Sequence, residues 1–227
     1  MNVHTSQQYE AELRALKDRL LAMGGRCESM LRQSISALQQ QDPELARVVA
    51  RLDNEINADE MAIDELAVKI LALRQPVGRD LRFLLTALKV VTDLERIGDE
   101  AVNIAERACE LAEEPGLPST ASRLGEMADA AATMLHEALD AFVEEDPAKA
   151  EHVLAADDAV DALYGETMRA TFAFISANSE RVRAAMAVAS CAKYTERVGD
   201  HATNIAEMVV YMVRGVDVRH SHPKKTP

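Results

Sequence analysis

The chain has 227 residues, of which 48% are apolar and only 4% aromatic. Few aromatic residues, nine glycines and seven prolines argue against a β-sandwich or β-barrel and predict an all-α protein. With 25 basic and 38 acidic residues, the net charge is −13, which excludes nonspecific nucleic-acid binding and favours cations or basic proteins as partners.

The sequence carries no signal for export or for membrane insertion. Its first residues are polar, and no apolar run approaches the ~18 residues that a spanning helix needs. Cys27, Cys109 and Cys191 form no CxxC pair, which indicates reduced thiols. We therefore expect a cytoplasmic protein without a transmembrane segment.

Three helices are expected in the first half of the chain. Thr5 or Ser6 is a candidate N-cap for a long first helix. Asp42 and Pro43 then supply an N-cap and a first helical residue, and Pro76 ends the second helix. The expected spans are 5–41, 43–74 and 79–113.

A Pro/Gly cluster at residues 113–120 predicts a linker to the second half. Three more helices follow it, with expected spans 122–145, 147–176 and 179–214. We accordingly assign a first three-helix bundle, a second one and a flexible tail, at residues 1–115, 116–217 and 218–227.

The two halves repeat one another. Residues 95–106 and 196–207 are identical at nine of twelve positions, at an offset of 101 residues. A weaker match at an offset of 104 places residues 42–43 on residues 146–147, both Asp-Pro. The change of offset falls where two interhelical loops differ in length. The chain is therefore predicted to be a tandem duplication of a three-helix unit.

Acidic side chains are spaced along one face of the third and sixth helices. Glu95, Asp99 and Asn103 follow one another at intervals of four residues, which keeps them on one stripe of a helix. The second unit repeats the pattern with Glu196, Asp200 and Asn204. Because adjacent acids on a helix repel one another, the repeated pattern favours a compensating cation.

The second and fifth helices carry further acids that would face these stripes. The candidate metal ligands there are Asp53, Glu60, Asp64, Asp157 and Asp161. Carboxylate and amide oxygens between two helices suit hard cations such as Fe(III), Mn(II) or Mg(II), and also admit Zn(II). The alternative is that these acids form solvated helix faces without metal.

Other residues are duplicated beside the acids. Gly98 and Gly199 remove a side chain and would let another helix or a ligand approach. Arg96 and Arg197 either support the site or cover surface with their stems. His201, which replaces a glutamate of the first unit, either joins a metal site or lies beside one.

These segments resemble the PhoU family, the phosphate-specific transport system accessory proteins. Residues 93–99 and 194–200 look like the paired E(D)xxxD signatures of that family, and the similarity extends from Tyr9 to His220. Further matching segments are residues 23–24, 71–77, 80–82 and 211–220.

The resemblance implies six helices in two three-helix bundles related by a pseudo-twofold axis, with iron or other metal ions at the carboxylate clusters. It also implies negative regulation of phosphate uptake, as an adaptor between the ATPase subunit of a phosphate ABC transporter and a sensor histidine kinase at the inner membrane. We further expect a homodimer. The chain departs from the paired pattern at Asn57, where the second unit has Asp161, which argues against equal metal occupancy of the two sites.

Other classes of function have less support. No Gly-rich phosphate loop, nucleophile elbow or Cys/His dyad occurs, so we do not expect an enzyme. A carboxylate-bridged di-metal oxidase would need Glu-x-x-His pairs, and no histidine has a glutamate three positions before it. A helical scaffold without metal is the remaining alternative.

Overall fold

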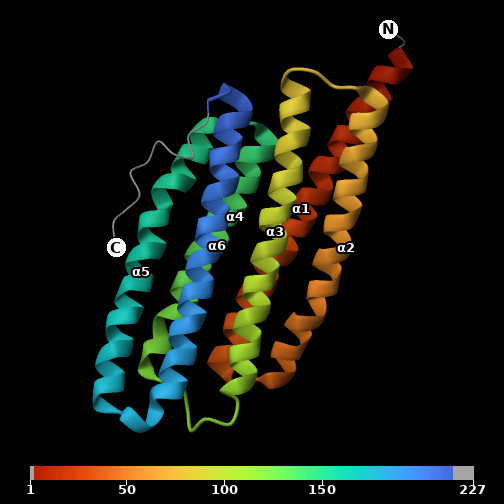
Figure 1. Cartoon of the computed structure of the whole chain (residues 1–227). Coiled ribbons are helices and arrows are strands. Elements are labelled where there is room, and N and C mark those ends of the chain that lie inside the picture. The colour runs from red at the N-terminus through yellow and green to blue at the C-terminus, as the bar shows by residue number, and fades with distance from the viewer. Residues whose placement is uncertain (1–2, 217–227) are drawn as a thin grey trace.

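The computed structural model describes residues 3–216, and this part of the chain is almost entirely helical (Figure 1). The long helices are α1 (Val3–Gln40), α2 (Pro43–Arg74), α3 (Arg79–Glu110), α4 (Leu124–Glu144), α5 (Pro147–Ala177) and α6 (Val182–Arg214). Two short 3-10 helices, η1 (Ser119–Arg123) and η2 (Ser179–Arg181), precede α4 and α6. The predicted all-α fold of six helices is confirmed. The predicted tail at residues 218–227 lies outside the described residues.

The repeated Asp-Pro pairs start α2 and α5 in the same way. The carboxylate of Asp42 accepts backbone N–H hydrogen bonds from the second and third residues after it, at 2.9 and 3.1 Å. Asp146 does the same at 2.8 and 3.3 Å. The residue before each aspartate, Gln41 or Glu145, has a positive φ and ends the preceding helix. These equivalent caps confirm the predicted starts of both helices.

Four predicted boundaries were wrong. The backbone is already helical at Val3, so Thr5 and Ser6 lie inside α1 and do not cap it. Helix α3 ends at Glu110, where the amide of Gln41 donates hydrogen bonds to two carbonyl oxygens of the following loop, at 2.7 and 3.0 Å. The segments before α4 and α6 form the 3-10 helices η1 and η2, so both α-helices begin later than predicted.

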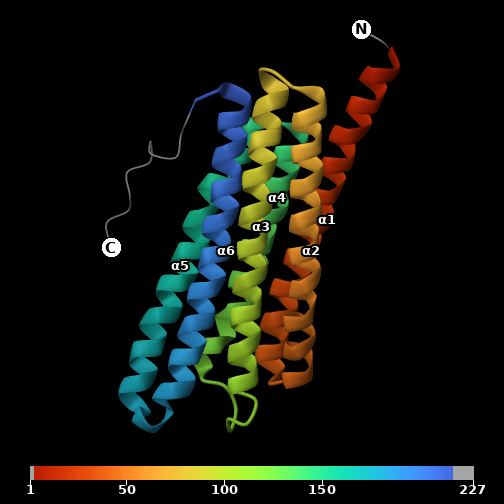
Figure 2. The ribbon, with the colours of Figure 1, turned by 45° about the vertical axis from the view of Figure 1, so that its right-hand side comes forward.

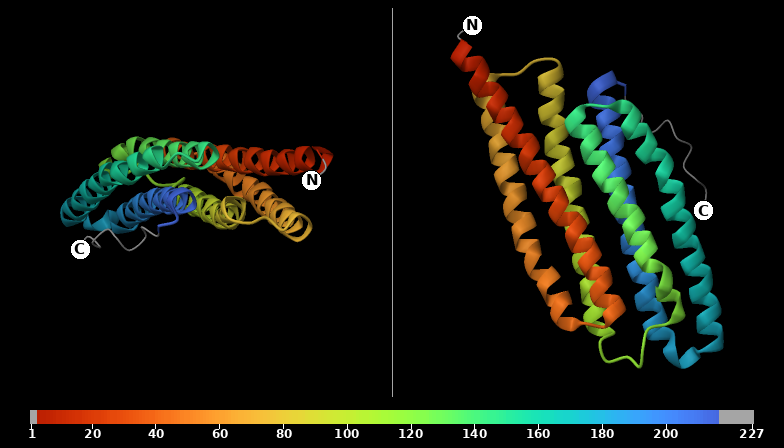
Figure 3. Two further views of the ribbon diagram at one scale, coloured as in Figure 1. Left: turned by 90° about the horizontal axis from the view of Figure 1, so that it is seen from above. Right: turned by 180° about the vertical axis from the view of Figure 1, so that it is seen from behind.

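The helices form two layers. Helices α2, α3, α6 and α5 lie side by side in a row, and α1 and α4 pack behind the central pair (Figures 2 and 3). Helices α3 and α6 are antiparallel, so the α2–α3 loop and the α5–α6 loop lie at opposite ends of the molecule. The arrangement consists of two three-helix bundles, α1–α3 and α4–α6, with an approximate twofold axis between α3 and α6.

The two bundles share one hydrophobic core. Leu20, Ile56 and Leu94 of the first bundle and Leu139 and Val198 of the second belong to a single contiguous cluster of buried side chains. Burial of this apolar surface is the main force that holds the bundles together. None of the helices in residues 3–216 is long and apolar enough to cross a membrane.

Helices α1 and α4 are in contact at Gly24. A Cβ atom added there would lie 2.0 Å from Cδ1 of Leu139, whose side chain is buried. A Cβ atom added at the neighbouring Gly25 would meet nothing within 4 Å. The two glycines therefore differ in packing although they share one helix.

We expect Gly24→Ala to lower the free energy of unfolding by about 1–3 kcal/mol, because overpacking a closed core outweighs the gain in helix propensity. Gly25→Ala is the matched control and should raise it by up to ~1 kcal/mol, since only the propensity changes. Urea denaturation of both variants measures the difference. Equal stabilities would contradict the close contact of α1 with α4.

Candidate metal centre

Two duplicated glycines allow the outer helices to approach the central ones. A Cβ atom on Gly98 of α3 would lie 3.2 Å from Cγ2 of Ile56 on α2, which is closer than most real contacts. On α6, a Cβ atom on Gly199 would lie 3.5 Å from Oδ1 of Asp157 on α5, an ordinary van der Waals distance. Both glycines therefore lie where an outer helix packs against a central one, and the contact is closest at Gly98.

The first acidic cluster consists of Asp53, Glu60 and Asp64 on α2 with Glu95 and Asp99 on α3. Burial raises the pKa of Glu95, and the charges of Asp99, Glu60 and Asp53 raise it further. Burial likewise raises the pKa of Glu60, with added repulsion from Asp64 and Asp99. The structure thus brings all five predicted ligands into one electrostatic environment.

Asp53 has one carboxylate oxygen without a partner. Oδ2 accepts a hydrogen bond of 2.9 Å from the Asn57 amide, whereas Oδ1 is buried and accepts none. Burial and the charge of Asp99 raise the pKa of Asp53. The guanidinium of Arg96 lies 3.6 Å from Glu95 and 3.7 Å from Asp99, and it does not reach the buried oxygen. A buried, unpartnered carboxylate oxygen is unfavourable and would be relieved by a cation.

The second acidic cluster consists of Asp157 and Asp161 on α5 with Glu196 and Asp200 on α6. Burial raises the pKa of Asp200, and the charges of Glu196 and Asp161 add to the effect. The ammonium of Lys193 donates a hydrogen bond to Glu196. The second cluster therefore contains a lysine ammonium in contact with one of its carboxylates.

The two predicted amide ligands hydrogen-bond to acids outside these clusters. Nδ2 of Asn103 donates to Glu100 at 3.2 Å, one turn earlier on α3. Nδ2 of Asn204 donates to Asp93 at 3.2 Å, across the interface between α3 and α6. The amide of Asn204 thus supports the contact between the central helices, whereas that of Asn103 bonds within α3.

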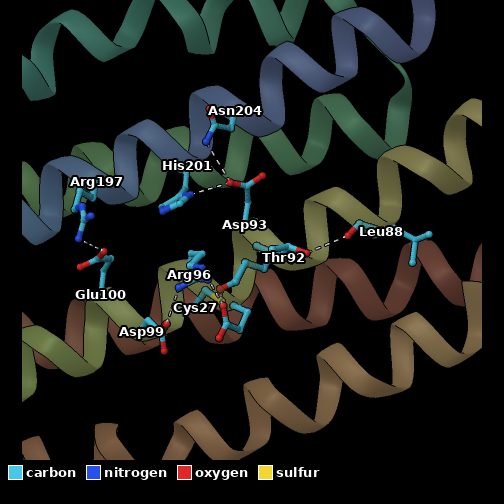
Figure 4. A network of polar contacts seen from close by, with 12 residues as sticks. Cys27, Leu88, Thr92, Asp93, Arg96, Asp99, Glu100, Arg197, His201 and Asn204 are labelled. Atoms are coloured by element: carbon cyan, nitrogen blue, oxygen red, sulfur yellow. Dashed lines mark hydrogen bonds and ion pairs between the residues drawn. The ribbon is translucent and has the colours of Figure 1, made fainter. Parts of the chain in front are cut away.

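Polar side chains connect α3 and α6 (Figure 4). Nδ1 of His201 lies 2.8 Å from the carboxylate of Asp93, and the guanidinium of Arg197 lies 2.9 Å from that of Glu100. We call these four residues, with Asn204, the α3–α6 seam. His201 therefore lies beside the second acidic cluster and pairs with Asp93.

Sequence reasoning missed Asp93 and Glu100 as functional neighbours of the sixth helix. The available signal was the replacement of Glu100 by His201 at the equivalent position, because it places an acid on one central helix and a basic residue on the other. The duplicated arginines also differ, since Arg96 contacts acids of its own helix whereas Arg197 reaches the other bundle.

We expect Arg197→Met to lower the free energy of unfolding by about 1–3 kcal/mol, because it removes the charged hydrogen-bond partner of Glu100, whose side chain is only 8% exposed. Arg96→Met, at the equivalent position, is the control. Its ion pairs are longer and its side chain is 61% exposed, so the loss should stay below ~0.5 kcal/mol. Denaturant titration of the two variants makes the comparison, and an equal loss would contradict the special role of Arg197.

The donor types of the acidic clusters fit a hard metal ion, although their positions do not converge on one point. Within residues 3–216, no three or more His, Cys, Asp or Glu side chains are arranged to hold an ion as they stand. The pKa values of Asp53, Glu95 and Asp200 are raised, so ionising these carboxylates costs more free energy in the folded chain than in the unfolded one. Their ionisation therefore lowers the stability of the fold as the pH rises through these pKa values. A cation would remove this repulsion, and the buried, unpartnered oxygen of Asp53 would be the first candidate for a ligand.

Comparison with known proteins agrees with the duplicated architecture. The model of the PhoU domain matches the chain twice, at residues 20–108 and 124–209, once in each bundle. The chain belongs to the PhoU family. The two matches coincide with the two acidic clusters and with the helices that carry them.

Relatives of nearly full length support this assignment. The phosphate-specific transport system accessory protein PhoU homolog of Pseudomonas putida is 40% identical over 98% of this chain and 87% of its own length. PhoU of Escherichia coli K12 is 36% identical over 97% of this chain and 91% of its own. The crystal structure of PhoU from Pseudomonas aeruginosa superposes with a TM-score of 0.87 at 39% identity, covering 92% of this chain and all of that one. PhoU from Streptococcus pneumoniae, titled a phosphate transport system regulatory protein, gives 0.85 at 27% identity, covering 92% and 99%.

Proposed function

We propose that this chain is an accessory protein of a phosphate transport system that represses phosphate uptake and the phosphate-starvation response. It would act as a non-enzymatic adaptor between the ATPase subunit of the transporter and a sensor histidine kinase. Such a protein would work in the cytoplasm and reach the inner membrane through these partners, as a homodimer.

The observation that carries the proposal is the pair of PhoU domain matches, together with relatives that align over nearly the whole chain. The names of these relatives describe accessory proteins of phosphate-specific transport. The net charge of −13 further favours docking to basic protein surfaces over contact with nucleic acids.

We also propose that metal ions, iron in the first place and otherwise Mn, Zn or Mg, neutralise the acidic clusters. The support is the concentration of carboxylates between paired helices, their raised pKa values and the unpartnered oxygen of Asp53. A bound ion would supply positive charge and a link between two helices. The ligands of the first cluster would be Asp53, Glu60, Asp64, Glu95 and Asp99, and those of the second Asp157, Asp161, Glu196 and Asp200.

Deleting the gene should give constitutive expression of a phosphate-starvation reporter in high phosphate, and the intact gene should restore repression. Pull-downs from cells should recover the transporter ATPase and the kinase with the wild-type chain, and added salt should weaken the association because exposed charges are screened within ~8 Å at 0.15 M. Normal repression in the deletion strain would contradict the regulatory role. Failure to recover either partner, with or without phosphate, would contradict the adaptor role.

The metal proposal predicts that Asp99→Asn lowers the metal content of chain purified without chelator and reduces the rise in melting temperature on adding metal, because it removes a ligand of an ion that binds the folded state. Glu113→Gln, in the loop after α3, is the control and should change neither. Elemental analysis and melting curves with Fe, Mn, Zn and Mg make the measurement. If the wild-type chain carries no metal and none of these ions shifts its melting point, the clusters are solvated faces of a metal-free scaffold.

A further inference from the structure

The two acidic clusters are not copies of one another. Helices α2 and α5 run without interruption, so the offset of 104 residues relates them along their length. At this offset Glu60 corresponds to Tyr164, and Asp64 corresponds to Met168. The second cluster gains Asp161 where the first has Asn57 but loses the two carboxylates further along the helix. The second cluster thus has fewer oxygen ligands for a metal.

The second cluster instead contains a cation of its own. At the offset of 101 that relates α3 to α6, Lys193 corresponds to Thr92, whose hydroxyl donates to a carbonyl oxygen of its own helix. The Lys193 ammonium donates a hydrogen bond to Glu196 and lies 5.4 Å from the centroid of the Tyr164 ring. The residues that replace Thr92 and Glu60 therefore meet each other beside the carboxylates.

Electrostatics tie the ammonium to the rest of the cluster. Burial lowers the pKa of Lys193, but its hydrogen bond to Glu196 and the charges of Glu196 and Asp200 outweigh burial, so the net shift is upward. Lys193 in turn opposes the rise in the pKa of Asp200 that burial and Glu196 cause. The lysine thus already supplies part of the positive charge that this cluster needs.

The cation of the first cluster, Arg96, is held more loosely, and it only partly offsets the rise in the pKa of Glu95 that burial and Asp99 cause. Arg96 approaches Glu95 and Asp99 only to 3.6 and 3.7 Å, its side chain is 61% exposed, and Oδ1 of Asp53 keeps no partner. In the second bundle the equivalent arginine, Arg197, turns to Glu100 in the α3–α6 seam. The repulsion between carboxylates is therefore offset by an exposed arginine in the first cluster and by a hydrogen-bonded lysine in the second.

We propose that Lys193 is the built-in counter-ion of the second acidic cluster and takes the place of a metal ion there, so that the chain holds metal only between α2 and α3. The role of Lys193 as a counter-ion does not depend on metal, whereas the restriction of metal to the first cluster rests on the metal binding proposed above. The experiment therefore separates the two clusters.

The test uses the full chain with Glu95→Gln and Asp99→Asn, which disable the first cluster. In this background, Fe(II), Mn(II), Zn(II) and Mg(II) should leave the melting temperature unchanged, because Lys193 occupies the second cluster. Adding Lys193→Thr, Tyr164→Glu and Met168→Asp rebuilds the first cluster's residues in the second bundle. This variant should bind metal in proportion to protein and regain a metal-dependent rise in melting temperature.

A second measurement needs no metal site in the first bundle. Lys193→Thr alone should lower the melting temperature of the metal-free chain, because the carboxylates of the second cluster lose their counter-ion. Lys89→Thr, which changes an exposed lysine of α3, is the control and should lower it less. Circular dichroism checks that every variant is folded.

The outcomes are distinct. Metal binding by the background variant that Asp200→Asn abolishes would overturn the proposal, because an ion would then occupy the second cluster beside Lys193. A rebuilt, folded cluster that takes up no metal would overturn it too, as would equal melting temperatures for the two lysine variants. A wild-type chain without metal would refute the metal binding of the first cluster. The role of Lys193 would then be decided by the melting temperatures of the two lysine variants alone.

Discussion

The packing of α2 against α3 and of α5 against α6 is the constraint on which the acidic clusters depend. It brings acids on facing helices together, and it is closest at Gly98, where a Cβ atom would lie 3.2 Å from Ile56. The shared hydrophobic core holds the helices in place, so the carboxylates cannot separate to relieve their repulsion. Their pKa values are raised because the packing of the helices buries these carboxylates beside one another.

Duplication supplied two such sites, and the chain has changed them independently. The first has more carboxylates and an unpartnered buried oxygen, whereas the second has a tyrosine and a methionine in place of two acids and a lysine in place of a threonine. The arginines diverged in the same way, one staying beside its own cluster and the other crossing to the opposite bundle. A repeated motif therefore does not imply repeated contacts, even when nine of twelve residues agree.

Much of the fold followed from the sequence because its signals are local. The Asp-Pro pairs fix two helix starts, and the internal repeat predicts both bundles. The end of α3 could not be predicted, since the loop that follows it is held by hydrogen bonds from Gln41, which is far away in the sequence. The acids at intervals of four residues predicted the clusters, but the partners of Asn103 and Asn204 depend on which helix face meets the other bundle. The spacing of residues within one helix does not indicate which of its faces meets the other bundle.

The α3–α6 seam also determines which helices can pair. Its acids, Asp93 and Glu100, belong to α3, whereas its basic side chains, Arg197 and His201, belong to α6. Two copies of α3 placed face to face in the same way would set Asp93 of each against Glu100 of the other, because Glu100 stands at the position equivalent to His201. Two copies of α6 would set Arg197 of each against His201 of the other, because His201 stands at the position of Glu100. The seam therefore joins the two unlike halves better than it would join two like ones.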